Sequence, residues 1–263
     1  MTTPNVPLRI ELTFEVPGTP EQVWDALATA HGISAWFIPT DVEEQEGGRI
    51  VFHMGPADSE GHITDWEPPR RLVYEEPGWA GLVGEEEADT TPLATEFLVE
   101  ARSGGTCAVR VVSSAFGTGA DWEQEFFDAM GEGWPPYFEH LRVYLAHFAG
   151  QVATPFRAEV DTKSPADDVG AALRSALQLA DGAPGDAVDL RGLPAVVEHV
   201  GPRHLVARST GEPAGYFAFL AYEKGDGIVA ASVTGYLFSD QAAAYIERER
   251  PGWQAWLEAL ELP

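Results

Sequence analysis

The sequence predicts an α+β fold in which a curved antiparallel sheet packs against a long helix, in two tandem copies. The segment 121–148 has apolar residues three or four positions apart, which is the spacing of one helix face. Most of the chain before it reads as strands, which would supply the apolar partner that such a face needs. The same order of segments then returns after residue 150 in a shorter form.

The first elements follow from local patterns. Leu8–Val16 alternates apolar and polar residues, which predicts a half-buried strand. Thr19 is expected to cap a helix that has Pro20 at its first position and runs to about Ala30. A second short helix is expected over 32–37, ending before a proline.

A run of strands is expected next, separated by turns rich in glycine and proline. These strands are expected at 41–46, 49–54, 61–66, 71–76, 93–101 and 106–116. The last two would form a hairpin across Ser103-Gly104-Gly105. The connection between 76 and 93 is long for a loop, which indicates a mobile or functional segment.

The long helical segment contains Gly131, Gly133 and the pair Pro135-Pro136. Proline lacks the N–H that a helix interior uses, and its ring clashes with the preceding turn. We therefore expect a short helix to about Met130, a kink, and a second helix from about Trp134.

The second half of the chain repeats this plan. Its elements are expected at 155–161 (strand), 166–179 (helix), 187–190, 195–200 and 204–209 (strands), 216–222 and 228–238 (hairpin) and 240–260 (helix). Both halves end with a hairpin, a turn of small residues, and a helix that contains a Gly-Trp pair. We expect two domains, residues 1–150 and 151–263, the second being a degenerate or trimmed copy of the first.

These features together resemble the START-like, or Bet v 1-like (SRPBCC), superfamily with its helix-grip fold. The local motifs look like its bacterial branch, related to the activator of the ninety-kilodalton heat-shock chaperone's ATPase. The matching segments are Pro20–Leu27, Ala35-Trp36-Phe37, Gly47–Ile50, Gly61-His62-Ile63, Pro68–Tyr74, Gly105-Thr106 and Gly133-Trp134. The resemblance covers residues 8–148 and implies a cavity between the sheet and the long helix, without implying one activity.

Charge excludes some partners. The chain has 16 basic and 42 acidic residues, a formal net charge of −26, which repels nucleic-acid backbones and anionic membrane surfaces. We therefore expect no nucleic-acid and no membrane partner, and no apolar run is long enough to span a bilayer. The start of the chain lacks a secretory signal pattern, and the single cysteine, Cys107, fits a reducing compartment, so we expect a cytoplasmic protein.

The residues predict no metal site, no cofactor and no catalytic group. Zinc sites need three or four close ligands, whereas His140 and His147 are the nearest helical pair among the seven histidines. The glycine pairs at 47–48 and 104–105 read as hairpin turns, because neither lies between a strand and a helix start.

The candidate ligand-binding residues are large apolar side chains and one arginine. The aromatic residues and methionine belong to the predicted cavity through the family resemblance, and plain core packing is the alternative for each. The set is Trp36, Phe37, Trp66, Trp79, Phe97, Arg110, Phe126, Met130 and Trp134. Arg110 depends on strand register: one register buries it beside a carboxylate or a ligand acid, and the other leaves it in solvent.

Three functions remain open. The first is binding of a small apolar or amphipathic molecule in the cavity. The second, implied by the branch of the family, is stimulation of the chaperone ATPase. The third is an enzyme of the cyclase or aromatase kind, for which no paired acid and base is visible. Beside these functions, a purely structural or interaction role, such as a dimer through the second domain, stays open. We expect binding rather than catalysis, and the pattern leaves the ligand and the oligomeric state open.

Overall fold

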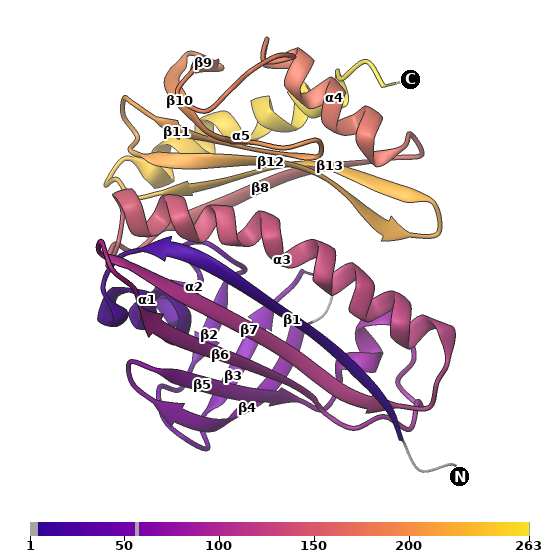
Figure 1. Cartoon of the computed structure of the whole chain (residues 1–263). Coiled ribbons are helices and arrows are strands. Elements are labelled where there is room, and N and C mark those ends of the chain that lie inside the picture. Colours follow the sequence, from indigo (N-terminus) through magenta and orange to yellow (C-terminus); the bar gives the residue numbers. More distant parts are fainter. Residues whose placement is uncertain (1–4, 56–57, 263) are drawn as a thin grey trace. The chain divides into compact units, whose positions relative to one another are not determined.

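The structure is a computed structural model that describes residues 5–55 and 58–262 (Figure 1). The chain divides into two compact units, residues 1–151 and residues 152–263, which we call the first and the second unit. Each unit contains one antiparallel sheet and a long C-terminal helix, so the predicted α+β helix-grip architecture in two copies is confirmed.

The first unit is built on a seven-stranded sheet in the order β1-β7-β6-β5-β4-β3-β2. Its strands are β1 (Val6–Pro17), β2 (Thr40–Val42), β3 (Arg49–His53), β4 (Asp58–Glu67), β5 (Arg71–Glu76), β6 (Leu93–Ala101) and β7 (Thr106–Gly117). Its helices are α1 (Pro20–Ala28), α2 (Ala30–Ile33), the 3₁₀ helix η1 (Trp79–Val83) and α3 (Asp121–His147). In Figure 1, α3 runs alongside β1 for most of its length.

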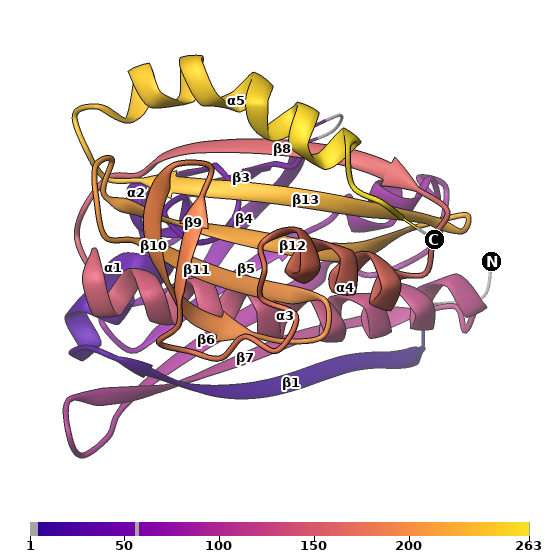
Figure 2. The same cartoon turned by 90° about the horizontal axis from the view of Figure 1, so that it is seen from above.

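The second unit has a six-stranded sheet in the order β8-β13-β12-β11-β10-β9. Its strands are β8 (Thr154–Thr162), β9 (Ala187–Leu190), β10 (Leu193–Val200), β11 (His204–Ser209), β12 (Gly215–Gly225) and β13 (Ile228–Leu237). Its helices are α4 (Ala166–Ala176) and α5 (Ala242–Glu258), and α5 lies along β8 (Figure 2).

The start of α1 matches its prediction. The Thr19 hydroxyl accepts the backbone N–H of Gln22, and the Gln22 side chain accepts the backbone N–H of Thr19. This reciprocal pair is a capping box, which satisfies two N–H groups that the first helical turn leaves without partners. The local sequence therefore fixes where the chain turns from β1 into α1.

Some predicted elements differ from the structure. The helix expected over 32–37 is α2, Ala30–Ile33, because the Thr29 hydroxyl accepts the N–H of Gly32 and starts the helix earlier. The strand expected at 41–46 is β2, Thr40–Val42. The segment after β5 is not a plain loop, since η1 lies within it and buries Trp79.

The two separate helices expected on either side of residues 131–136 are one, because α3 is a single helix of 27 residues that includes Pro135 and Pro136. Side chains on both sides of the prolines hold it to the sheet: Trp134 packs on Phe97 and Phe138 stacks on Phe14, with ring centres 5.6 and 3.8 Å apart. Burial of such rings contributes several kcal/mol, which exceeds the ~3 kcal/mol that a proline costs inside a helix. Packing therefore overrides the local preference.

The N-terminal end of α3 is fixed by a buried carboxylate. Glu123 accepts the backbone N–H groups of Thr118 and Gly119 at 2.8 Å each, and the Thr118 hydroxyl at 2.9 Å. Burial raises the pKa of Glu123, but these hydrogen bonds outweigh it and hold that pKa below its ordinary value. The loop between β7 and α3 is thereby tied to the first turn of the helix.

Candidate functional site

The inner face of the first sheet, which we define as the face that packs against α3, carries polar groups among its apolar residues. On β6 and β7, Thr95 and Ser113 are directly opposite each other, and their hydroxyls lie 3.1 Å apart. On β5, Tyr74 pairs with Thr95 across the strands. All three residues are buried, so the row crosses the middle of the sheet away from solvent.

A buried carboxyl group lies one step further along β5. Glu76 shares the inner face with Leu72 and Tyr74 and is 7% exposed. The hydroxyl of Ser59, on β4, donates a hydrogen bond to Glu76 Oε1. Within residues 5–55 and 58–262 this is the one hydrogen bond to the carboxyl group. Its second oxygen therefore remains available to another molecule.

Burial changes the acidity of both ionisable groups on this face. Loss of hydration raises the pKa of Glu76, and the Ser59 hydroxyl opposes this in part. Loss of hydration also raises the pKa of Tyr74 far above its usual value, with a further contribution from Glu76 and an opposing one from the Thr95 hydroxyl. A carboxyl group with a raised pKa can donate a hydrogen bond or a proton to a bound molecule.

Five aromatic rings surround the middle of this face in a closed series of contacts. The rings belong to Phe37, Phe52, Tyr74, Phe97 and Trp134. Successive ring centres lie 6.0, 5.5, 6.4, 5.6 and 5.4 Å apart, and the last contact returns to Phe37. We call these five residues the aromatic ring set. The indole N–H of Trp134 is buried and has no hydrogen-bond acceptor in the described part of the chain.

The inner face is better suited to an apolar molecule than to an anion. Ligand sites are mostly apolar with a few polar groups that fix orientation. No inner-facing residue of the described strands of this sheet is Lys or Arg, so nothing there would neutralise a buried anion. A neutral or positively charged molecule with an apolar body matches the inner face.

Four of the residues predicted from the sequence lie together here. Phe37, Phe97 and Trp134 belong to the aromatic ring set, and Trp36 contacts Phe37 with ring centres 5.5 Å apart. Trp36 is fully buried, and its indole N–H donates to the carbonyl of Ala26 at 2.8 Å. That bond gives Trp36 a structural role at the α1–α2 junction.

The other predicted apolar residues lie in two different places. Trp66 packs edge-on against Trp24 of α1, with ring centres 5.0 Å apart. Trp79, Phe126 and Met130 belong to a smaller cluster between η1 and the first half of α3. The Trp79 indole N–H donates to the carbonyl of Thr91 at 2.9 Å, so this cluster anchors the segment after β5.

Arg110 lies on the opposite face of the sheet from the aromatic ring set. Its neighbours Val109 and Val111 are fully buried, whereas the Arg110 side chain is 41% exposed. The guanidinium contacts Glu11 at 3.0 Å and Glu96 at 3.5 Å. The register that the sequence left open is therefore the one that places Arg110 outside, where neighbouring carboxylates already pair with it.

The polar residues of the inner face were not among the site residues predicted from the sequence. The segment Arg71–Glu76 contains a signal for the buried carboxyl group. Every second residue of a strand lies on the same face, so Glu76 shares a face with the apolar residues Leu72 and Tyr74. Thr95 and Ser113 likewise share the alternation of their buried neighbours. Without the register between strands, these three segments could not be brought onto one surface.

No three His, Cys, Asp or Glu side chains gather as metal ligands would, within the described residues. None of the helices described is long and apolar enough to cross a membrane.

The fold and this inner face define the first unit as a START-like, or Bet v 1-like, domain. Residues 17–146 match the model of a family described as "Activator of Hsp90 ATPase homolog 1-like protein". The match lies within the first unit and agrees with the family that the sequence motifs resemble. A search of curated proteins gave no match.

Several solved structures are similar in fold. Protein MLL2253 from Mesorhizobium loti is 21% identical, with a TM-score of 0.46, over 53% of this chain and 98% of that one. The Aha1 dimer from Colwellia psychrerythraea is 18% identical, with a TM-score of 0.43, over 52% and 96%. The di-domain ARO/CYC BexL from the BE-7585A biosynthetic pathway is 15% identical, with a TM-score of 0.44, over 95% and 96%.

Proposed function

We propose that the first unit binds a small amphipathic molecule between the inner face of its sheet and α3. The observation that supports this most directly is the buried polar set on an apolar face: the Thr95–Ser113 hydroxyl pair, Tyr74 and Glu76. Glu76 accepts one hydrogen bond, from Ser59, and its second oxygen makes none to the described residues and is not fully buried. A ligand with a polar head would supply a partner for that oxygen.

The aromatic ring set would contact the apolar body of this ligand. Of the residues predicted from the sequence, we propose Phe37, Phe97 and Trp134 as ligand contacts, and assign Trp36, Trp66 and Trp79 to packing. We further propose that the first 150 residues form the binding domain and that residues 151–263 form a shorter helix-grip copy whose inner face is filled by its own side chains.

The test compares ligand binding with and without the hydroxyl pair. Decanol and 2-naphthol would be titrated into the whole protein by calorimetry, with thermal shift as a second measurement. In the variant T95F/S113G, a ring would occupy the site of the two hydroxyls, and we expect binding to fall by at least about tenfold. Glu100→Gln, an exposed carboxylate on the outer face of β6, is the matched control and should bind like the wild type.

Failure of both compounds to bind, or equal binding by T95F/S113G and the wild type, would overturn this proposal. Near-ultraviolet circular dichroism would show whether the variant T95F/S113G is folded, which the comparison requires.

A second candidate function, co-chaperone activity, is favoured by the family description alone. We propose that an effect on the ninety-kilodalton chaperone be tested with the chaperone from the same source, by measuring ATP hydrolysis with increasing amounts of this protein. An unchanged rate at saturating protein would remove this candidate and would leave the ligand-binding proposal intact.

A further inference from the structure

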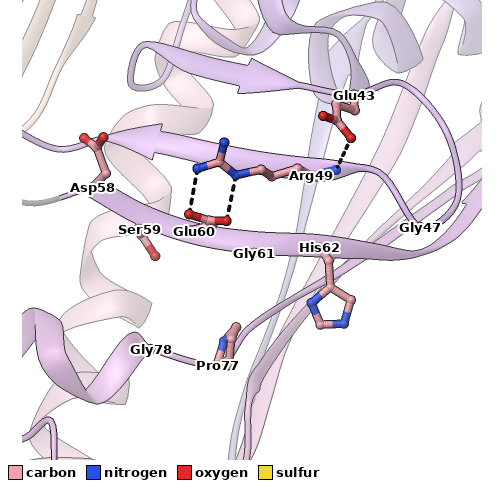
Figure 3. A pocket seen from close by; sticks show the side chains of 10 residues that line it. All are labelled: Glu43, Gly47, Arg49, Asp58, Ser59, Glu60, Gly61, His62, Pro77 and Gly78. Carbon is pink, nitrogen blue, oxygen red and sulfur yellow. Dashed lines mark hydrogen bonds and ion pairs between the residues drawn. The ribbon is translucent and has the colours of Figure 1, made fainter.

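A hollow of about 580 Å³ lies at the end of β4, beside the turn that follows β5 (Figure 3). It is lined by Glu43, Gly47, Arg49, residues 58–62 of β4, and Pro77-Gly78. The pairing between β4 and β5 ends at His62 and Glu75, while β4 continues to pair with β3 as far as Asp58. Pro77 has no N–H to extend the pairing with β4, so the two strands separate where the hollow lies.

The hollow is adjacent to the buried carboxyl group of the inner face. Ser59 lines it, and the Ser59 hydroxyl is the donor to Glu76. Gly61 also lines it and packs against the same side chain, since a Cβ atom on Gly61 would come within 3.1 Å of Glu76 Cγ. In Figure 3 the Ser59 side chain points toward the Pro77-Gly78 turn. Ser59 and Gly61 therefore lie next to both the hollow and Glu76.

The charges around the hollow favour a cation. Glu43, Asp58 and Glu60 line it. The arginine present, Arg49, is already paired: its guanidinium makes two hydrogen bonds of 2.7 Å to Glu60, and its backbone N–H donates to Glu43. Glu60 is occupied by the same pair, Asp58 contacts His53 at 3.1 Å, and His62 also lines the hollow. An ammonium group would therefore pair with Glu76, whose second oxygen makes no hydrogen bond to the described residues.

Together with the ligand site, these features specify a class of molecule. We propose that this hollow is the mouth of the binding site and that the ligand is an amphiphile whose polar head is a positively charged amine. The ammonium group pairs with Glu76, and the apolar body lies against the aromatic ring set, whose ring faces also attract cations. This inference rests on the proposed ligand-binding function of the first unit.

The experiment compares three molecules with the same ten-carbon chain: decylamine, decanol and decanoate. Each would be titrated into the whole protein by calorimetry below its micelle-forming concentration, at 0.15 M salt to screen the net charge of the chain. We expect decylamine to bind at least about tenfold tighter than decanol, and decanoate to bind more weakly than either. Butylamine, which has the head without the body, should not bind measurably.

Glu76→Gln keeps the shape of the side chain and its bond from Ser59 while removing the charge. We expect this variant to bind decylamine and decanol with similar affinity, because the preference for the amine is lost. Ser59→Ala is a second variant, which removes the hydrogen bond to Glu76 and leaves the carboxyl group in place. It should still bind decylamine more tightly than decanol. The control Glu100→Gln should preserve the wild-type order of the three molecules.

The outcomes separate the two proposals. Two outcomes would overturn the amine assignment and leave the ligand-binding function standing. In one, the wild type binds decanol as tightly as decylamine. In the other, Glu76→Gln still prefers the amine. Absence of binding by all three molecules overturns both. Butylamine binding equal to that of decylamine would mean adsorption of cations to an acidic surface, which also overturns the assignment.

Discussion

Each unit has an equivalent aromatic pair on its inner face. In the first unit Phe97 lies opposite Val111 on the hairpin and packs on Trp134, with ring centres 5.6 Å apart. In the second unit Phe219 lies opposite Val233 and packs on Trp253 at 5.7 Å. Both tryptophans follow a glycine in the final helix, so the repeated Gly-Trp motif performs the same packing role twice.

The next cross-strand pair away from the hairpin turn differs. The first unit has Thr95 opposite Ser113, and the second has Phe217 opposite Gly235. Glycine is required there, because a Cβ atom on Gly235 would come within 2.1 Å of the ring of Phe156. The rings of Phe217 and Phe156 in the second unit therefore occupy the position that the hydroxyls of Thr95 and Ser113 have in the first unit.

This difference supports the proposal that the first unit is the one that binds a ligand. The hydrophobic core of the second unit includes Leu205, Ala207, Phe217, Phe219 and Trp253. Its buried polar side chains, such as Ser209, which donates to the carbonyls of Pro213 and Gly215, do not occupy the position of the Thr95–Ser113 pair. One fold therefore serves as a filled core in one unit and as a proposed ligand site in the other.

The largest expected effect comes from transferring the hydroxyl pair to the second unit. The variant F217T/G235S removes a buried ring that contacts Trp253 at 5.8 Å and adds two hydroxyls to an apolar core. We expect a loss of at least about 3 kcal/mol in the free energy of unfolding, because the Cβ atom added at position 235 meets the ring of Phe156, and because a cavity and buried polar atoms also cost stability. Urea unfolding, with hydrogen exchange of β12 and β13, measures it. A loss below about 1 kcal/mol would show that the two interiors are interchangeable.

The helix starts of the two units can be compared through Glu123. Neither N-cap residue, Ala120 of α3 or Gln241 of α5, makes a side-chain capping hydrogen bond, and in the first unit Glu123 fixes the start of the helix from within its first turn. Glu123→Ala leaves the N–H groups of Thr118 and Gly119 without an acceptor, and we expect it to cost about 2 kcal/mol. The exposed neighbour Glu125→Ala is the control and should be nearly neutral.

The same carboxylate predicts a pH dependence. Because the folded state lowers the pKa of Glu123 below its ordinary value of 4.5, the stability that Glu123 contributes is fully present above pH 4.5 and is lost as the pH falls through the folded pKa. Thermal unfolding between pH 3 and pH 7 should show Glu123→Ala and the wild type converging at acid pH. A constant difference across this range contradicts the assignment.

Glu76 should show the opposite sign. Its folded-state pKa is raised, so the native protein binds a proton more tightly than the unfolded chain, and stability falls as the pH rises from 4.5 toward the folded pKa. Glu76→Gln should therefore be more stable than the wild type at neutral pH, by less than the loss in Glu123→Ala, and equal to it in acid. A variant less stable than the wild type at neutral pH would mean that Glu76 supports the fold instead of the site.

The smallest expected effect is on the hydroxyl pair itself. Replacing both partners of a buried hydrogen bond with apolar groups of similar shape is nearly neutral, so T95V/S113A should change the free energy of unfolding by less than about 1 kcal/mol. Ligand binding should nevertheless weaken. Large destabilisation without any change in binding would assign the pair to folding alone.

Local patterns in the sequence predicted most elements of both units. The hairpin over 216–238, the capped start of α1 and the repeated Gly-Trp helices all follow from signals within a few residues. The helix break did not occur, because the energy that opposes it comes from rings on distant strands such as Phe14 and Phe97. Arg110 could not be oriented for a related reason: alternation shows which residues share a face but not which face is buried.

The sequence by itself determined the order of the elements, the two copies and the acidic character of the chain. Only the tertiary structure decided that Ser59, Tyr74, Glu76, Thr95 and Ser113 meet on one inner face. These residues come from four strands, and the register between strands depends on hydrogen bonds and packing between segments far apart in the chain. The register between the strands decides whether a carboxyl group such as that of Glu76 is buried on the inner face. No local sequence pattern specifies that register.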